Sequence, residues 1–176
     1  PGSRKQEIKK ILPIFVDVVN NFKSYQFLIA AAPSIDSKFY LSIIKNNTIK
    51  IIHNDTYNLL THSKAALVTS GTATLETALL KIPQLVCYKT SFVSFFIAKR
   101  LVKLNYISLV NLILNKEVVK ELIQKNCNAK KITEELKELL MRKNKSILKE
   151  YELLFKKIGN NKASKITSKL IINSIK

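Results

Sequence analysis

Apolar residues near the start of the chain recur with helical spacing and then gather in short runs. Between Ile8 and Phe22 they return every three or four residues, which places them on one face of an amphipathic helix. Pro13 lies within this pattern, and we expect it to break the early turns because proline lacks an amide hydrogen. Four compact apolar runs then follow, as is typical of buried parallel strands: Gln26 to Ala31, Ile49 to His53, Ala65 to Thr69 and Gln84 to Tyr88.

Segments with helical spacing separate these runs, at residues 37–45, 56–62 and 72–81. Alternation of strand and helix predicts an α/β fold with a Rossmann-like, doubly wound parallel sheet. After Leu101 comes a short apolar segment, 107–114, and then a Lys-rich tail that we expect to be helical at 116–125, 132–141, 146–158 and 163–175.

The first four residues, Pro1 to Arg4, form a turn with no strand before it. We expect them to be the loop that follows a first strand absent from these residues and that enters the first helix, where such folds bind phosphates. Residues 1–125 are then predicted to form one ligand-binding domain that lacks its first strand, with helices of residues 126–176 packed on it.

Charge and cysteine content narrow the function classes. The formal net charge is +18, with lysines spread through every segment, so polyanions or an anionic membrane face are conceivable partners, but solvated helix faces are the favoured interpretation. Cys87 and Cys127 lack CxxC spacing, and His53 and His62 lack a carboxylate at ligand or triad spacing, so we expect no metal site and no disulfide. A reducing cytoplasm fits this pattern.

The strongest local motif runs from Leu67 to Glu76, where a strand enters a small, hydroxyl-rich turn and then a helix. Gly71 allows a ligand close to the backbone. Hydroxyls of Ser70, Thr72 and Thr74 beside amides at a positive helix end suit a diphosphate. Glu76 is equally compatible with a capping box and with accepting hydrogen bonds from a ribose.

Arg4 follows a glycine at the start of the first predicted helix. Its guanidinium would clamp the other side of the same diphosphate through paired hydrogen bonds.

Several blocks occur together in an order that resembles lipid-A-disaccharide synthase. No single block is specific, but the ordered set is, and it reaches from the first residue to about Gln124. The blocks are Pro1-Gly2-Ser3-Arg4 with Glu7-Ile8, Ser70 to Glu76, Ala98 to Lys103, Ile107 to Ile113 and Glu121 to Gln124. Val110 stands where that family usually has proline.

The resemblance implies a GT-B glycosyltransferase whose C-terminal, Rossmann-like domain holds the UDP-sugar. Such enzymes transfer 2,3-diacylglucosamine from UDP-2,3-diacylglucosamine to 2,3-diacylglucosamine 1-phosphate, with inversion and release of UDP, and need no cofactor. Arg4 and the Ser70 to Thr74 turn would then hold the diphosphate, and Glu76 the ribose or sugar. The same cleft would be lined by Asn111 and, on the next predicted helix, Glu121 and Gln124.

The resemblance also implies which part of the enzyme lies outside these residues and where in the cell the enzyme acts. The general base and the acceptor pocket belong to the family's N-terminal domain, so the catalytic residues are unknown and this chain alone is expected to be inactive. We expect a cytoplasmic enzyme that contacts the anionic inner membrane of a Gram-negative bacterium. The membrane-facing candidates are Phe92, Phe95, Phe96, Lys99 and Arg100, although we favour a buried helix there.

Three alternatives remain open. A second GT-B enzyme such as a UDP-N-acetylglucosamine epimerase would use a similar turn. A basic nucleic-acid-binding module would explain the charge, but no nucleic acid is expected, because the aromatic residues do not alternate with arginine and no helix-turn-helix or zinc-finger spacing occurs. A truncated product without a role of its own is the third.

Overall fold

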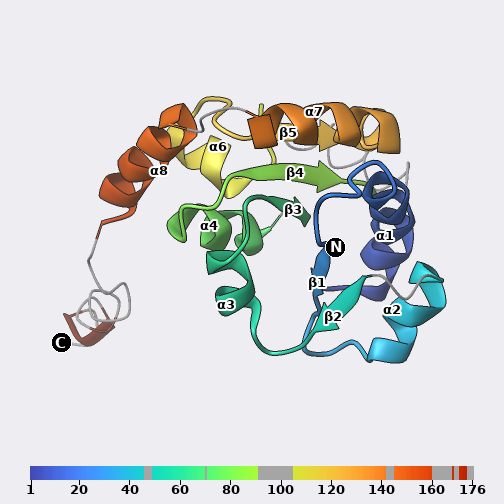
Figure 1. Cartoon of the computed structure of the whole chain (residues 1–176). Coiled ribbons are helices and arrows are strands. Elements are labelled where there is room, and N and C mark those ends of the chain that lie inside the picture. Colours follow the sequence, from blue (N-terminus) through green and yellow to red (C-terminus); the bar gives the residue numbers. More distant parts are fainter. Residues whose placement is uncertain are drawn as a thin grey trace.

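The computed structural model describes residues 1–45, 49–69, 71–90, 105–141, 145–159, 168 and 171–173. Strands and helices alternate along most of the chain (Figure 1). The strands are β1 (Leu28–Ala30), β2 (Lys50–Ile52), β3 (Ala66–Thr69), β4 (Gln84–Tyr88) and β5 (Lys120–Ile123). The helices are α1 (Lys5–Val19), α2 (Ser37–Ile44), α3 (Thr56–Thr61), α4 (Thr72–Leu79), α6 (Leu109–Leu114), α7 (Ala129–Met141) and α8 (Lys145–Ile158), with a 3₁₀ turn, η1, at Gln124–Asn126.

All strand pairs that the structure describes are parallel, which confirms the predicted α/β class. β1 pairs with β2, placing Ile29 opposite Ile51. β4 lies between β3 and β5, placing Val86 beside both Val68 and Glu121. The strands form two sheets, β1-β2 and β3-β4-β5, rather than one continuous sheet.

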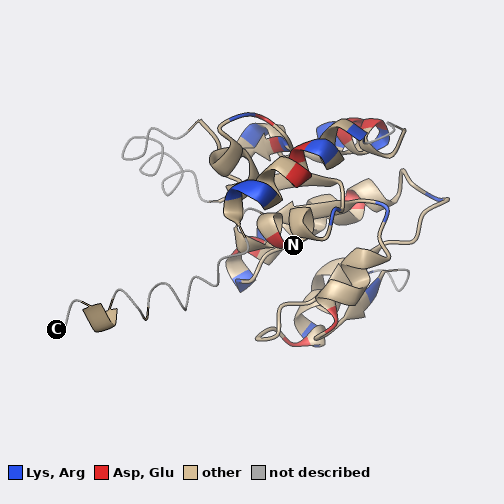
Figure 2. Cartoon of the chain, turned by 90° about the vertical axis from the view of Figure 1, so that its left-hand side faces the viewer, with Lys and Arg blue, Asp and Glu red and all other residues tan. Residues whose placement is uncertain are grey.

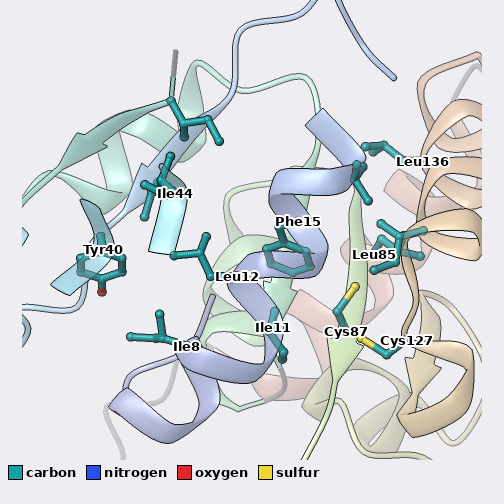
Figure 3. Packing of buried hydrophobic residues seen from close by; sticks show 14 of the residues in the cluster. Ile8, Ile11, Leu12, Phe15, Tyr40, Ile44, Leu85, Cys87, Cys127 and Leu136 are labelled. Carbon is teal, nitrogen blue, oxygen red and sulfur yellow. The ribbon is translucent and has the colours of Figure 1, made fainter. Parts of the chain in front are cut away.

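Helix α1 supplies the centre of the main core. Its buried residues Ile8, Ile11, Leu12 and Phe15 lie between α2 on one side and β4 with α7 on the other (Figure 3). Pro13 is exposed, and the helix runs without interruption from Lys5 to Val19. The expected break at Pro13 is therefore wrong, because tight packing of the opposite face holds the turns on both sides of the proline.

The predicted helix at 116–125 is also wrong. Residues Lys120–Ile123 form β5, paired with β4, and Gln124 begins η1. Pairing with a buried strand outweighs local helix preference here. The apolar segment 107–114 contains the short helix α6, which begins after Ser108, whose hydroxyl accepts a hydrogen bond from the Asn111 amide.

The predicted C-terminal helices are present where the structure describes them. They comprise α7, α8 and the helical residues 168 and 171–173. Tyr151 and Leu154 of α8 pack with Val86, Val110 and Val119 in a second buried cluster. A division of the chain at residue 125 stays a prediction.

Candidate functional site

A large cavity opens beside β3, where that strand ends and α4 begins. Its volume is about 2140 Å³, and its walls include the loop Pro1 to Arg4, the end of β3, the start of α4 and the residues after β4 and β5. Five of the predicted donor-binding residues line it: Arg4, Gly71, Thr72, Glu76 and Gln124. Segments far apart in the sequence therefore meet at one concavity, as ligand sites in parallel α/β proteins do.

The turn before α4 is built around Gly71. Its φ is +142°, in the region that favours glycine, and a Cβ placed there would meet nothing within 4 Å. The Thr74 hydroxyl donates to the Gly71 carbonyl at 2.8 Å, and the Thr74 amide donates to the same oxygen at 3.2 Å. Thr72 and Ala73, the first two residues of α4, line the cavity, and amides at these positions have no partner within a helix.

Thr74 itself does not line the cavity. Its side chain is fully buried and holds the turn through the Gly71 carbonyl. The expectation that its hydroxyl faces the phosphates is not supported by this geometry, because the hydroxyl is already engaged behind the turn. Ser70 lies outside the described residues.

Thr69, the last residue of β3, is a cavity residue that sequence reasoning missed. It is only 6% exposed, and its hydroxyl is buried without a hydrogen-bond partner among the described residues. Such groups are rare, since an unmade hydrogen bond costs about 1–3 kcal/mol. The signal in the sequence that could have indicated Thr69 is a polar residue at the end of an otherwise apolar strand.

The loop Pro1 to Arg4 contacts the end of β3 directly. A Cβ built on Gly2, whose φ is +108°, would lie 3.6 Å from Thr69 Cγ2 and 2.9 Å from Glu7 Oε2. The Ser3 amide donates to Glu7 Oε2 at 3.3 Å. Arg4 Nη1 lies 3.9 Å from Glu7 Oε1, and the Arg4 side chain is 82% exposed. Because solvent weakens that ion pair, the guanidinium is available to a ligand.

Glu76 occupies the second turn of α4 and lines the cavity. The capping-box alternative is wrong, because the N-cap is Gly71, which has no side chain, and the third helical residue is Thr74. A contact with a ribose or sugar stays a prediction.

Gln124 lies at the far wall of the cavity, where β5 meets η1. Its Oε1 accepts a hydrogen bond of 3.1 Å from the Thr90 amide, and its φ is +49°. The residue therefore also fixes the chain that leaves β4.

Asn111 and Glu121 do not line the cavity. Asn111 is fully buried; its Oδ1 accepts from the amides of Val118 and Val119, and its Nδ2 donates to the Val119 carbonyl and to Glu121 Oε1. Glu121 also accepts from the Ile107 amide and from the Ser108 amide and hydroxyl, at 2.7 to 3.0 Å. Both side chains are engaged in positioning α6 against β5, and valine at position 110 leaves this network intact.

The cysteines face each other in the core (Figure 3). Both thiols are free and buried. The hydrogen bond with Cys127, together with burial, raises the pKa of Cys87, whereas the hydrogen bond from Cys87 lowers the pKa of Cys127. His53 accepts or donates a 2.6 Å hydrogen bond with Ser37 on the surface. Among the described residues, no group of His, Cys, Asp and Glu could hold a metal ion.

Several predictions concern residues that the structure does not describe. The membrane-facing candidates Phe92, Phe95, Phe96, Lys99 and Arg100 all lie outside it. No described helix has the length and apolar character needed to cross a bilayer. Figure 2 shows Lys and Arg on several separate helices with Asp and Glu between them, as expected for solvated faces.

Comparison with known proteins identifies relatives of the whole chain. The family model for lipid-A-disaccharide synthetase matches residues 1–173. Proteins named lipid-A-disaccharide synthase are similar to it: the one from Persephonella marina is 38% identical over 75% of the chain and 38% of its own length. The one from Psychromonas ingrahamii is 35% identical over 90% of the chain and 44% of its own length. The one from Syntrophus aciditrophicus is 34% identical over 100% of the chain and 48% of its own length. The chain thus spans less than half the length of these relatives.

Proposed function

Because the chain belongs to the lipid-A-disaccharide synthetase family, we propose that it is the part of a glycosyltransferase that holds a UDP-sugar donor. The whole enzyme would join UDP-2,3-diacylglucosamine to 2,3-diacylglucosamine 1-phosphate and release UDP. The family match favours this reaction over the epimerase alternative.

The observation that carries the proposal is the wall around Gly71. Thr72 and Ala73 at the start of α4, Thr69 at the end of β3 and Arg4 with its exposed guanidinium all border one cavity. Helix N-termini bind phosphates through their first amides and through the positive end of the helix dipole. The glycine leaves the space above the turn open for an approaching oxygen.

The residues then divide into two roles. Arg4, Thr69 and the Gly71 turn would bind the diphosphate, and Glu76 and Gln124 would lie toward the ribose and sugar. Asn111, Glu121 and Thr74 are assigned a positioning role, since each is engaged within the protein. In the reaction, an acceptor hydroxyl attacks the anomeric carbon as the UDP oxygen leaves, which inverts the configuration in one step. The base that removes the hydroxyl proton would come from the part of the enzyme outside this chain.

Partners follow from the same proposal. The acceptor pocket and an N-terminal domain would be supplied by the rest of the protein, and the acyl chains of both substrates would bring the enzyme to the anionic inner-membrane surface from the cytoplasmic side.

Calorimetry with UDP and with uridine tests the diphosphate site. UDP should bind and raise the melting temperature, whereas uridine, which lacks the phosphates, should bind far more weakly. Gly71→Ala should reduce UDP affinity tenfold or more, by roughly the loss of one charge-assisted hydrogen bond. Arg4→Ala should have a similar effect.

Matched controls separate binding from stability. Gly159→Ala introduces the same kind of backbone strain, at a φ of +72°, at the end of α8 and outside the cavity lining. Lys10→Ala removes one positive charge from an exposed position of α1. Both should leave UDP affinity unchanged. A melting temperature that does not respond to millimolar UDP, or equal effects of Gly71→Ala and Gly159→Ala on affinity, would contradict the proposal.

A further inference from the structure

Two cysteines from distant parts of the sequence meet in the main core. Cys87 belongs to β4, and Cys127 follows η1, the 3₁₀ turn that comes directly after β5. Both side chains are fully buried and belong to the same apolar cluster. Figure 3 shows the two side chains beside each other in this core. The proposed function uses neither thiol, so the pair is available for a chemistry of its own.

The geometry of the strands explains why the two thiols meet. Successive side chains of a strand point to opposite faces of the sheet. Cys87 faces the main core, whereas its neighbour Val86 belongs to the second buried cluster. Cys87 is paired with Leu122 of β5, and Leu122 and Cys127 both belong to the main core. The face of β4 that carries Cys87 is therefore the face that Cys127 packs against.

The two thiols interact directly and differ in reactivity. The hydrogen bond between them lowers the pKa of Cys127 and raises that of Cys87. The ammonium group of Lys89, whose Nζ lies 3.4 Å from the Cys127 carbonyl oxygen, lowers the pKa of Cys127 further. Because the thiolate is the form that attacks an oxidant, Cys127 is the more reactive partner.

Cys127 also belongs to the part of the chain that opens more easily. Lys125 and Asn126, the two residues before it, are exposed, and the Cys127 amide donates to the Gln124 carbonyl within the same short turn. Cys87 lies in β4, which is paired with a strand on each side. A short surface turn opens at a lower cost in free energy than a central strand. A small oxidant therefore reaches Cys127 first.

We propose that Cys87 and Cys127 form an oxidation site that a small peroxide converts into a reversible disulfide. The Cys127 thiolate attacks one oxygen of hydrogen peroxide, the O–O bond breaks, and the departing hydroxide takes up the thiol proton to become water. The Cys87 sulfur then attacks the sulfenic sulfur of Cys127, and the S–O bond breaks with release of a second water. In total, two thiols are oxidised to one disulfide, and one hydrogen peroxide is reduced to two water molecules.

The disulfide adds a covalent link within one wall of the large cavity. Residues next to each cysteine line that wall: Tyr88, Lys89 and Thr90 after Cys87, and Gln124, Lys125 and Asn126 before Cys127. Two hydrogen bonds join these segments in the reduced protein, from the Thr90 amide to Gln124 Oε1 and from Lys89 Nζ to the Cys127 carbonyl. Oxidation fixes the same wall covalently. The inference concerns thiol chemistry and does not depend on the proposed activity.

Treatment of the reduced 176-residue chain with hydrogen peroxide tests this. The intact mass should fall by two hydrogen atoms, and a peptide map should show Cys87 joined to Cys127. Because a disulfide restricts the unfolded chain, the melting temperature should rise by about 5–15 °C. Dithiothreitol should restore both the mass and the melting temperature of the reduced protein.

Two variants separate the facing pair from thiol reactivity alone. Cys87→Ser removes the second thiol, so oxidation of Cys127 should stop at a sulfenic acid that dimedone traps. Val86→Cys combined with Cys87→Ser moves the thiol by one residue to the opposite face of β4, and it should give no disulfide with Cys127. Melting curves without peroxide show whether each variant is folded.

The contrary results are distinct from a failure to bind UDP, because no nucleotide is present. Thiols of the folded chain that stay reduced in millimolar peroxide, or that give only sulfinic acid, would overturn the proposal. So would a disulfide that lowers the melting temperature, since the folded core would then not accommodate the bond. Disulfide formation at the same rate in the variant with the thiol at position 86 would also contradict it.

Discussion

Replacing Asn111 by alanine distinguishes a positioning role from a direct contact with the ligand. The side chain is fully buried and makes four hydrogen bonds of 2.8 to 3.0 Å. Alanine would leave the amides of Val118 and Val119 and the Val119 carbonyl without this partner. At about 1–3 kcal/mol for each buried unsatisfied group, the free energy of unfolding should fall by about 4 kcal/mol.

Thermal and urea unfolding measure this loss. For a chain of this size, about 4 kcal/mol corresponds to a melting temperature lower by roughly 8–16 °C. Asn21→Ala is the control, because the Asn21 Nδ2 donates to the Asp17 carbonyl at 3.2 Å on the surface, and its removal should change stability by less than about 0.5 kcal/mol. If Asn111→Ala melted like Asn21→Ala but no longer bound UDP, the positioning role would be refuted.

An aspartate at the same position gives a second test if the alanine variant does not fold. Asn111→Asp keeps the oxygen that accepts from Val118 and Val119 but places a second oxygen against Glu121 Oε1, which the Nδ2 now contacts at 2.8 Å. Two carboxylates this close cannot both stay charged without a large cost. The destabilisation should therefore shrink as the pH falls from 8 to 5, because protonation restores one donor. A deficit independent of pH would argue against the contact.

Two further predictions concern buried titratable groups. Burial raises the pKa of Tyr151 to about 12 from 10.0, so the folded chain holds this proton more tightly than the unfolded chain does. The free energy of unfolding should therefore fall between pH 10 and 12, and Tyr151→Phe should abolish this fall. A similar alkaline loss of stability in both proteins would contradict the prediction. Iodoacetamide should label Cys127 before Cys87, since mutual hydrogen bonding lowers the pKa of Cys127 and raises that of Cys87. Mass spectrometry measures the ratio of label on Cys127 to label on Cys87. In the urea-unfolded chain, which is the control, both cysteines should label at the same rate. Faster labelling of Cys87 in the folded chain would contradict the prediction.

Local patterns predicted the first half of the fold well because each element there carries its own signal. The helix that ends at Val19 has one apolar stripe, and the runs around Ile29, Ile51, Val68 and Val86 are short and bounded by turn residues. The segment after Leu114 lacked such a signal. Its residues 120–123 read as part of a helix, and only pairing with β4 makes them a strand.

The candidate site was predictable in part. A glycine in a hydroxyl-rich turn after a strand indicated the start of α4, and the structure brings Arg4 to the same cavity. Spacing along the sequence could not show which polar side chains form hydrogen bonds within the protein. Thr74, Asn111 and Glu121 are engaged internally, whereas Thr69, read only as a strand residue, lines the cavity.

A buried chain of contacts ties the last long helix to the turn at Gly71. The Gln84 Nε2 donates to the Thr74 carbonyl at 2.8 Å and lies 3.4 Å from the Tyr151 Oη, which donates to the Ile82 carbonyl at 3.3 Å. The Thr74 hydroxyl in turn donates a hydrogen bond to the Gly71 carbonyl. Helix α8 thus supports the turn at Gly71 from the side opposite the cavity. A chain shortened before Lys145 would keep every cavity-lining residue and still lose the Tyr151 contact that helps to hold Gln84 against the turn.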